Sequence, residues 1–146
     1  MTSKPPFVAQ ERSDTCMLAC LRMILAHHGM AVSEAALLRE IAMEEGGVDP
    51  DQLASLAQRY GLNALAQPLD LDAISALVRS ERYPIVLIDR TPLDGEFAVH
   101  AVIPIRFTRR YITLLDPLRG ERRVTIRKFE EAQRRVGGWA VVWEPG

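Results

Sequence analysis

The chain has 146 residues, of which 48% are hydrophobic and 25% charged, and its net charge is −1. These values are typical of one globular domain with a buried core, so residues 1–146 are predicted to form a single domain. The first residues, MTSKPPFVAQ, lack the apolar core of a secretory signal, and the longest apolar stretch, at 97–105, is too short for membrane insertion. Two cysteines cannot build a disulfide framework, which favours a reducing, cytoplasmic location.

The charges are divided unevenly along the chain. Residues 1–105 carry 8 basic and 14 acidic side chains, and residues 106–135 carry 10 basic and 4 acidic ones, which gives net charges of −6 and +6. The basic segment is either a surface for an acidic partner or a solvated face of turns and one amphipathic helix. Aromatic residues do not alternate with its arginines as in a base-stacking surface, so no nucleic acid partner is expected.

The first half of the sequence has helical periodicity. Apolar side chains recur at helical spacing over 16–28, and Gly29 follows as a residue that can end the helix. Asp49-Pro50-Asp51-Gln52 combines a capping residue, a proline at the first helical position and a glutamine three residues after the cap, which is a strong helix start. The helices predicted here are 16–28, 33 to about 43, 49 to about 60 and, with a weaker pattern, 71–79 after Asp70.

The second half changes to the short apolar runs of β-strands. The predicted strands are 85–88, 97–105, 111–115, 123–126 and 139–143, with one short helix at 127–135. The run 97–105 is apolar on both faces, which suits a central strand. Helices that precede antiparallel strands predict an α+β domain, in which the N-terminal helices pack on a C-terminal antiparallel β-sheet.

Four residues have the chemistry that a cysteine nucleophile needs: Gln10, Cys16, His100 and Asp116. Cys16 opens a predicted helix, where unpaired N–H groups and the helix dipole favour a thiolate. An imidazole can move protons, and a carboxylate can orient that imidazole. The side-chain amide of Gln10, six residues before Cys16, can donate a hydrogen bond to an oxyanion.

The predicted hairpin brings two of these residues together. Residues 106–110 form a short polar connection between the strands at 97–105 and 111–115. If Ile105 pairs with Tyr111, His100 lies directly opposite Asp116 on one face of the sheet. A slip of one residue would place the two side chains on opposite faces.

Each residue also has a structural interpretation. A helical cysteine is more often a small buried hydrophobe, as we expect for Cys20, and a histidine in an apolar strand is more often part of the core. Asp116 before Pro117 is also typical of a turn. The joint occurrence of all four residues favours catalysis. No second cysteine or histidine stands at ligand spacing near His100, so neither a metal nor another cofactor is expected.

On these residues the chain resembles a papain-like cysteine peptidase. Within that group it is most similar to the bacteriocin-processing peptidase domains that precede ABC exporters and cut after a double-glycine leader. The matching segments are Gln10, TCMLACLRMILAHHG at 15–29, GGVDPDQLASLAQRYGL at 46–62, HAVIPI at 100–105, LLDPLRGERRVTIRKFEE at 114–131 and GWAVVW at 138–143.

The resemblance implies a role for each candidate residue: Cys16 as nucleophile, His100 as general base and acid, Asp116 as the residue that orients His100, and Gln10 as oxyanion donor. Relatives commonly have an acidic residue before the nucleophile and glycine after it, whereas this chain has Thr15 and Met17. A methionine at that position would narrow the cleft in which a peptide lies.

The sequence therefore predicts a cysteine peptidase that acts on a peptide or protein through an acyl-enzyme. The resemblance implies cleavage after small residues such as Gly-Gly. Two alternatives stay open: a transglutaminase-like acyl-transfer enzyme with the same Cys, His, Asp order, and a non-catalytic peptide-binding module of the same fold. The expected partners are the peptide substrate and an ABC exporter encoded separately, because this sequence carries no transporter segment.

Overall fold

The structure, a computed structural model, describes residues 4–41 and 47–144. Its elements follow in the order α1 (Cys16–His27), α2 (Glu34–Arg39), α3 (Pro50–Arg59), β1 (Asn63–Pro68), α4 (Leu71–Arg79), β2 (Ile85–Asp89), α5 (Thr91–Asp94), β3 (Val99–Phe107), β4 (Tyr111–Asp116), β5 (Gly120–Thr125), α6 (Ile126–Arg134) and β6 (Trp139–Glu144). Among the described residues, no helix is long and apolar enough to cross a membrane.

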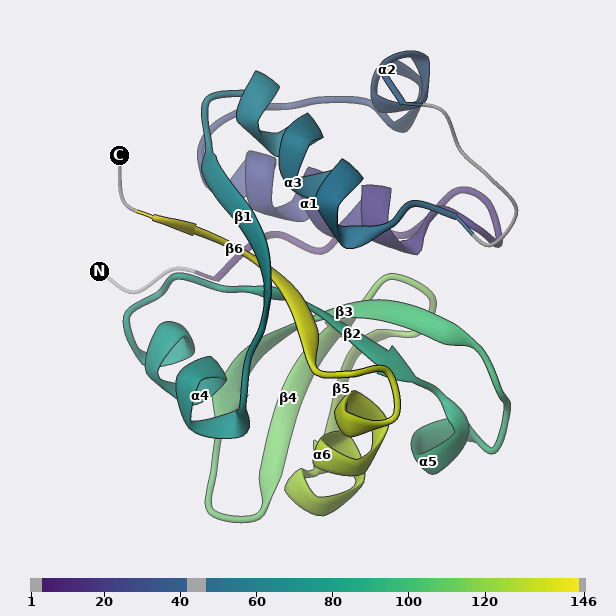
Figure 1. The fold of residues 1–146 in the computed structure, drawn as a ribbon, viewed down its shortest axis with the longest axis vertical. Helices are drawn as coiled ribbons and strands as arrows, with labels where there is room; N and C mark the ends of the chain where they lie inside the picture. The colour runs from purple at the N-terminus through teal and green to yellow at the C-terminus, as the bar shows by residue number, and fades with distance from the viewer. Residues whose placement is uncertain (1–3, 42–46, 145–146) are drawn as a thin grey trace.

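The six strands form one antiparallel sheet in the order β1-β6-β2-β3-β4-β5. Helix α1 packs on β2 and β3, and α3 packs on β1 and β6. Figure 1 shows α1, α2 and α3 on one side of β2 and β3, and α4, α5 and α6 on the other. The predicted α+β class, with N-terminal helices against an antiparallel sheet, is confirmed.

Local sequence explains where the helices start. Asp49 and Gln52 exchange the two hydrogen bonds of the predicted capping box, and the side chain of Asp70 caps α4. Helix α2 ends earlier than predicted, at Arg39, and the predicted end at Met43 lies outside the described residues. Helix α1 is mostly apolar and has eight buried residues, so burial against the sheet fixes the position of its first residue, Cys16.

Two elements were not predicted. Strand β1 (Asn63–Pro68) ends at a proline and pairs only with β6 at the edge of the sheet, so its sequence has little of the pattern of a buried strand. Helix α5 (Thr91–Asp94) is a single turn that stops at Gly95, whose φ of 72° suits glycine. Strand β3 also starts and ends two residues later than predicted, and β5 starts at Gly120 instead of residue 123.

The predicted register of the β3–β4 hairpin is wrong. Ile105 does not pair with Tyr111; instead Phe107 pairs with Ile112 close to the turn. The register then shifts between Pro104 and Arg106, at a β-bulge. His100 is therefore not directly opposite Asp116, although both side chains lie on the same face, one diagonal step apart.

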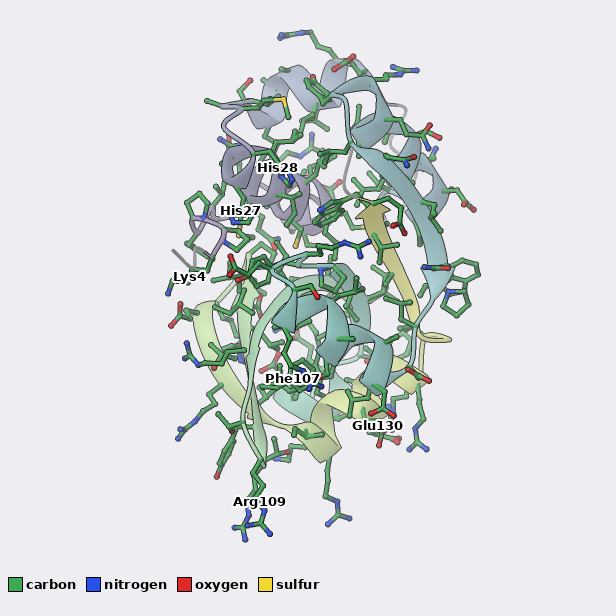
Figure 2. The ribbon with its side chains drawn as sticks, turned by 90° about the vertical axis from the view of Figure 1, so that its left-hand side faces the viewer. Lys4, His27, His28, Phe107, Arg109 and Glu130 are labelled. Carbon is green, nitrogen blue, oxygen red and sulfur yellow. The ribbon has the colours of Figure 1, made fainter. Side chains whose placement is uncertain are left out.

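The basic segment 106–135 covers the β3–β4 hairpin, β5 and α6. Figure 2 shows Arg109, at the tip of the hairpin, at one end of the molecule, and His27 and His28 of the α1 region in the other half. Part of this positive charge is matched within the fold, since Arg135 pairs with both Asp89 and Glu131.

Candidate active site

Cys16 is the first residue of α1 and is half-buried. The residue before it, Thr15, is fully buried, and its hydroxyl bonds the backbone of Arg12 instead of capping the first turn of the helix. The first-turn N–H groups beside Cys16 are thus left to interact with water or a ligand. A helix terminus in this state favours negative charge on the thiol or on a bound group.

His100 and Asp116 form a buried pair. The Nε2 atom of His100 lies 2.7 Å from Oδ1 of Asp116, and the two residues are only 5% and 1% exposed. The side chain of Cys16 also acts on His100 and helps to raise its pKa. Because Nε2 is occupied by Asp116, the other ring nitrogen is the one available to the thiol. The structure therefore brings Cys16 beside the hydrogen-bonded pair of His100 and Asp116.

The surroundings of this pair change the pKa of both partners. Burial by itself would lower the pKa of His100, but the hydrogen bonds with Asp116 and Cys16, and the charges of both, raise it to about 9. Burial would raise the pKa of Asp116, but the hydrogen bond and charge of His100 hold it below its usual value. At neutral pH the pair is consequently an imidazolium and a carboxylate.

A second charged group holds the other oxygen of Asp116. Nη1 of Arg122, on β5, lies 3.4 Å from Oδ2 of Asp116 and 3.0 Å from Oδ1 of Asp94. Asp94 ends α5 with a side chain that is only 6% exposed, and it also accepts a bond from Arg90 at 3.2 Å. This network was not predicted from the sequence. Its signal is the short turn at 117–119, which pairs Asp116 with Gly120 and puts Arg122 on the same face as Asp116.

Gln10 lies in the same site, with its side chain turned toward its own loop. Its backbone N–H donates to the carbonyl of Pro117 (3.0 Å), next to Asp116, and its Nε2 donates to the carbonyl of Arg12 (2.8 Å). The amide nitrogen has two hydrogens, so the bond to Arg12 leaves one for a ligand. Oε1 is buried and has no hydrogen-bond partner among the described residues.

Two cavities meet at the pair of Cys16 and His100, and both are also lined by Asp14 and Val99. The first, which we name the Met17 cavity, has about 330 Å³ and is further lined by Met17, Gly47, Val48, Asp49, Pro50, Gln52 and Leu87. The second, the Leu118 cavity, has about 450 Å³ and is further lined by Gln10, Ser13, Arg90, Ala98 and Leu118. Cys16 and His100 are thus accessible from two adjoining cavities.

The family model described as the Peptidase C39 family matches residues 4–136, which include Gln10, Cys16, His100 and Asp116. The chain belongs to the Peptidase C39 family. The predicted membership of a cysteine peptidase family of the bacteriocin-processing type is confirmed. The colicin V secretion/processing ATP-binding protein CvaB of Escherichia coli is 29% identical over 143 residues, which are 97% of this chain. The chain spans 18% of the length of that relative.

Solved structures with this fold include a putative C39-like peptidase from Bacillus anthracis, with a TM-score of 0.83, 20% identity and coverage of 99% of both chains. A double glycine motif protease from an AMS/PCAT transporter, in complex with the leader peptide, has a TM-score of 0.79 at 18% identity, covering 98% of this chain and 93% of that one. At this identity the likeness establishes the shared fold, which agrees with the predicted architecture.

Proposed function

We propose that this chain is a C39 cysteine peptidase in which Cys16 is the nucleophile, His100 moves the proton and Asp116 orients His100. The observation that carries the proposal is the hydrogen-bonded pair of His100 and Asp116, with Cys16 and His100 lining the same two cavities. A nucleophile, a base within reach and a third group that orients the base are the parts of a catalytic triad.

The geometry supports an ordinary acyl-enzyme sequence. The Cys16 thiolate attacks the carbonyl carbon of the scissile peptide bond, and the carbonyl electrons move to the oxygen. When the C–N bond breaks, the imidazolium of His100 gives its proton to the leaving amine. A water molecule then attacks the thioester while neutral His100 takes its proton, and the Cys16 thiolate leaves the new carboxylic acid. Asp116 stays ionised throughout and stabilises the imidazolium.

We assign the oxyanion site to the backbone N–H of Cys16 and the side-chain amide of Gln10. The Cys16 N–H is one of the unpaired groups at the start of α1. The Gln10 amide lies on the wall of the Leu118 cavity beside Cys16 and keeps one hydrogen for a ligand. Two donors at the point where negative charge develops are typical of acyl-transfer sites.

For the substrate, we propose a peptide with small residues such as Gly-Gly before the scissile bond. The buried side chain of Met17 lines the cavity next to Cys16 and fills space there that a glycine would leave open. The likeness to a double glycine motif protease and to a colicin V secretion/processing protein supports the same substrate class. An ABC exporter is the partner that we propose on this ground.

The first test compares the two cysteines. At about pH 6 an ordinary thiol is almost entirely neutral and alkylates slowly. Cys20 is fully buried, and burial together with the nearby Cys16 raises its pKa. Iodoacetamide at pH 6 should therefore modify Cys16 quickly and Cys20 hardly at all, and His100→Ala should slow the reaction of Cys16. Peptide mapping by mass spectrometry reads both sites in one experiment, with Cys20→Ala as the matched control.

The second test identifies the reaction. A peptide with a Gly-Gly segment should yield a product with a free carboxyl group, and Cys16→Ala should abolish this cleavage. An amide formed with an added primary amine in place of the carboxyl product would indicate acyl transfer. If Cys16 is as inert as Cys20 and no peptide is cleaved, the chain is a non-catalytic module of this fold.

A further inference from the structure

Large apolar side chains gather at the rim of the Leu118 cavity. The exposed ones among the described residues are Phe7, Leu65, Phe97, Val99, Leu118 and Trp139. Val99 and Leu118 line the cavity, and Phe97 directly precedes Ala98, which also lines it. Their exposed fractions are 82% for Phe97, 57% for Val99 and 48% for Leu118. Val99 and Leu118, which we name the rim patch, leave apolar surface in water beside the nucleophile.

The backbone under the rim patch is held by the same hydrogen bonds that build the site. The N–H of Arg90 donates to the carbonyl of Ala98 (3.0 Å), which ties the segment before β3 to the end of β2. The N–H of Leu118 donates to Oδ1 of Asp116 (2.9 Å). Apolar side chains on a backbone fixed in this way lose little freedom when a ligand covers them, which favours binding.

Apart from the four residues that they share, the two cavities take their walls from different parts of the fold. The Met17 cavity is formed mainly by α1 and residues 47–52 of the helical layer, whereas the Leu118 cavity takes Ala98 and Leu118 from the ends of the strands beside His100. The acyl group stays bonded to Cys16 in the helical layer, and the leaving amine takes its proton from His100 on the sheet. This division assigns the Leu118 cavity to residues that follow the scissile bond.

Charge in the Leu118 cavity is already matched by neighbouring groups. The guanidinium of Arg90 pairs with Asp94 (3.2 Å) and Glu96 (3.3 Å), and the carboxylate of Asp14 pairs with Arg12 (3.3 Å). A charged substrate side chain would compete with these ion pairs, although Oδ1 of Asp14 and Oε1 of Gln10 make no hydrogen bond among the described residues. An apolar side chain would instead cover the rim patch and remove its surface from water.

We propose that the rim patch and the Leu118 cavity form a binding subsite for an apolar side chain in the first two residues after the scissile bond. This subsite rests on the proposed peptidase function, and it adds a preference on the side of the substrate that leaves. Leu118 is its specificity-determining residue, because it lines this cavity and not the Met17 cavity, and it carries exposed apolar surface just after β4.

The test uses two peptides with the same leader and Gly-Gly segment, followed either by Leu-Leu or by Ser-Ser. The unmodified chain should cleave the Leu-Leu peptide with the higher kcat/KM. Leu118→Ser should lower the ratio of the two kcat/KM values about tenfold, as expected for loss of one partly buried apolar contact. Leu65→Ser is the matched control, because Leu65 is also an exposed leucine (40%) but lies on β1, at the far edge of the sheet.

The other outcomes are distinguishable. If the unmodified chain cleaves both peptides at equal rates, or if Leu118→Ser slows both equally with an unchanged melting temperature, the subsite is wrong and the peptidase proposal stands. A variant that changes the preference for residues before the scissile bond instead would contradict the assignment of the cavity to the leaving side. If no peptide is cleaved by the unmodified chain, the proposed function fails, and the subsite fails with it.

Discussion

His100 and Asp116 lie on the same face of the sheet because β3 contains a bulge between Pro104 and Arg106. If the register next to the hairpin turn continued along the strands, Asp116 would lie opposite Ile103 and its side chain would leave the opposite face from His100. The extra residue shifts the pairing by one and restores the shared face. Pro104 has no N–H to give to the ladder, which is consistent with a bulge at this position.

The hydrogen bond between His100 and Asp116 predicts the effect of Asp116→Asn. The amide keeps the shape of the side chain but cannot hold the imidazolium by charge, so kcat should fall by up to about 10⁴-fold. The same change removes groups that raise the pKa of His100, so the alkaline limit of activity, near pH 9 in the unmodified chain, should move to lower pH. The pH profile of kcat measures both effects. Full activity of Asp116→Asn would show that another group orients His100.

The raised pKa of His100 should also appear in stability. The pKa of about 9 in the folded chain lies above the value of about 6.5 for an unfolded histidine, so the folded chain binds more protons between these values. The contribution of His100 to the free energy of unfolding is fully present below pH 6.5 and is lost as the pH rises through 9. In total it amounts to about 3 kcal/mol. Urea unfolding at pH 6, 7.5 and 9 should show that the free energy of unfolding falls with pH in the unmodified chain and not in His100→Gln. If the free energy of unfolding changes with pH in the same way in both proteins, the raised pKa of His100 is contradicted.

Arg122 is predicted to position Asp116 without touching the substrate. Arg122→Gln removes a charge that helps to hold the pKa of Asp116 below its usual value. As the pH is lowered, the variant should therefore lose activity at a higher pH than the unmodified chain does. The value of kcat should fall about tenfold, and Arg122→Lys should recover part of it. Arg123→Gln is the control, because Arg123 stacks on Tyr111, 4.4 Å from the ring centre, and should leave the profile unchanged. Loss of folding without a shift in the profile would indicate a structural role only.

Gln10→Ala tests the oxyanion assignment. Removal of one oxyanion donor typically costs about 10²–10³ in kcat, so acylation should slow by this factor. The variant also loses the hydrogen bond from Nε2 to the carbonyl of Arg12, which is worth only about 1 kcal/mol, so the melting temperature should change little. Normal kcat with a much lower melting temperature would identify Gln10 as a structural loop residue.

The candidate residues could be predicted from the sequence because their signals are local. The capping box of Asp49 and Gln52, the cap at Asp70 and the helical spacing after Cys16 depend on residues within one or two turns, and the structure has each of them. Cys16 at the start of a helix follows from the same signals. The order of helices followed by strands was likewise sufficient to predict the α+β class.

The geometry of the site depended on contacts between distant parts of the chain. The diagonal relation of His100 to Asp116 follows from a bulge that adds one residue, and no local pattern specifies its position. Strand β1 forms because β6, some seventy residues later, offers it an edge, and Arg122 reaches Asp94 only when α5 folds beside β5. Propensities and caps act over a few residues, so the sequence by itself determined the elements and the chemical groups. Register, cavities and charge networks are set by packing across the whole domain, and only the tertiary structure decided them.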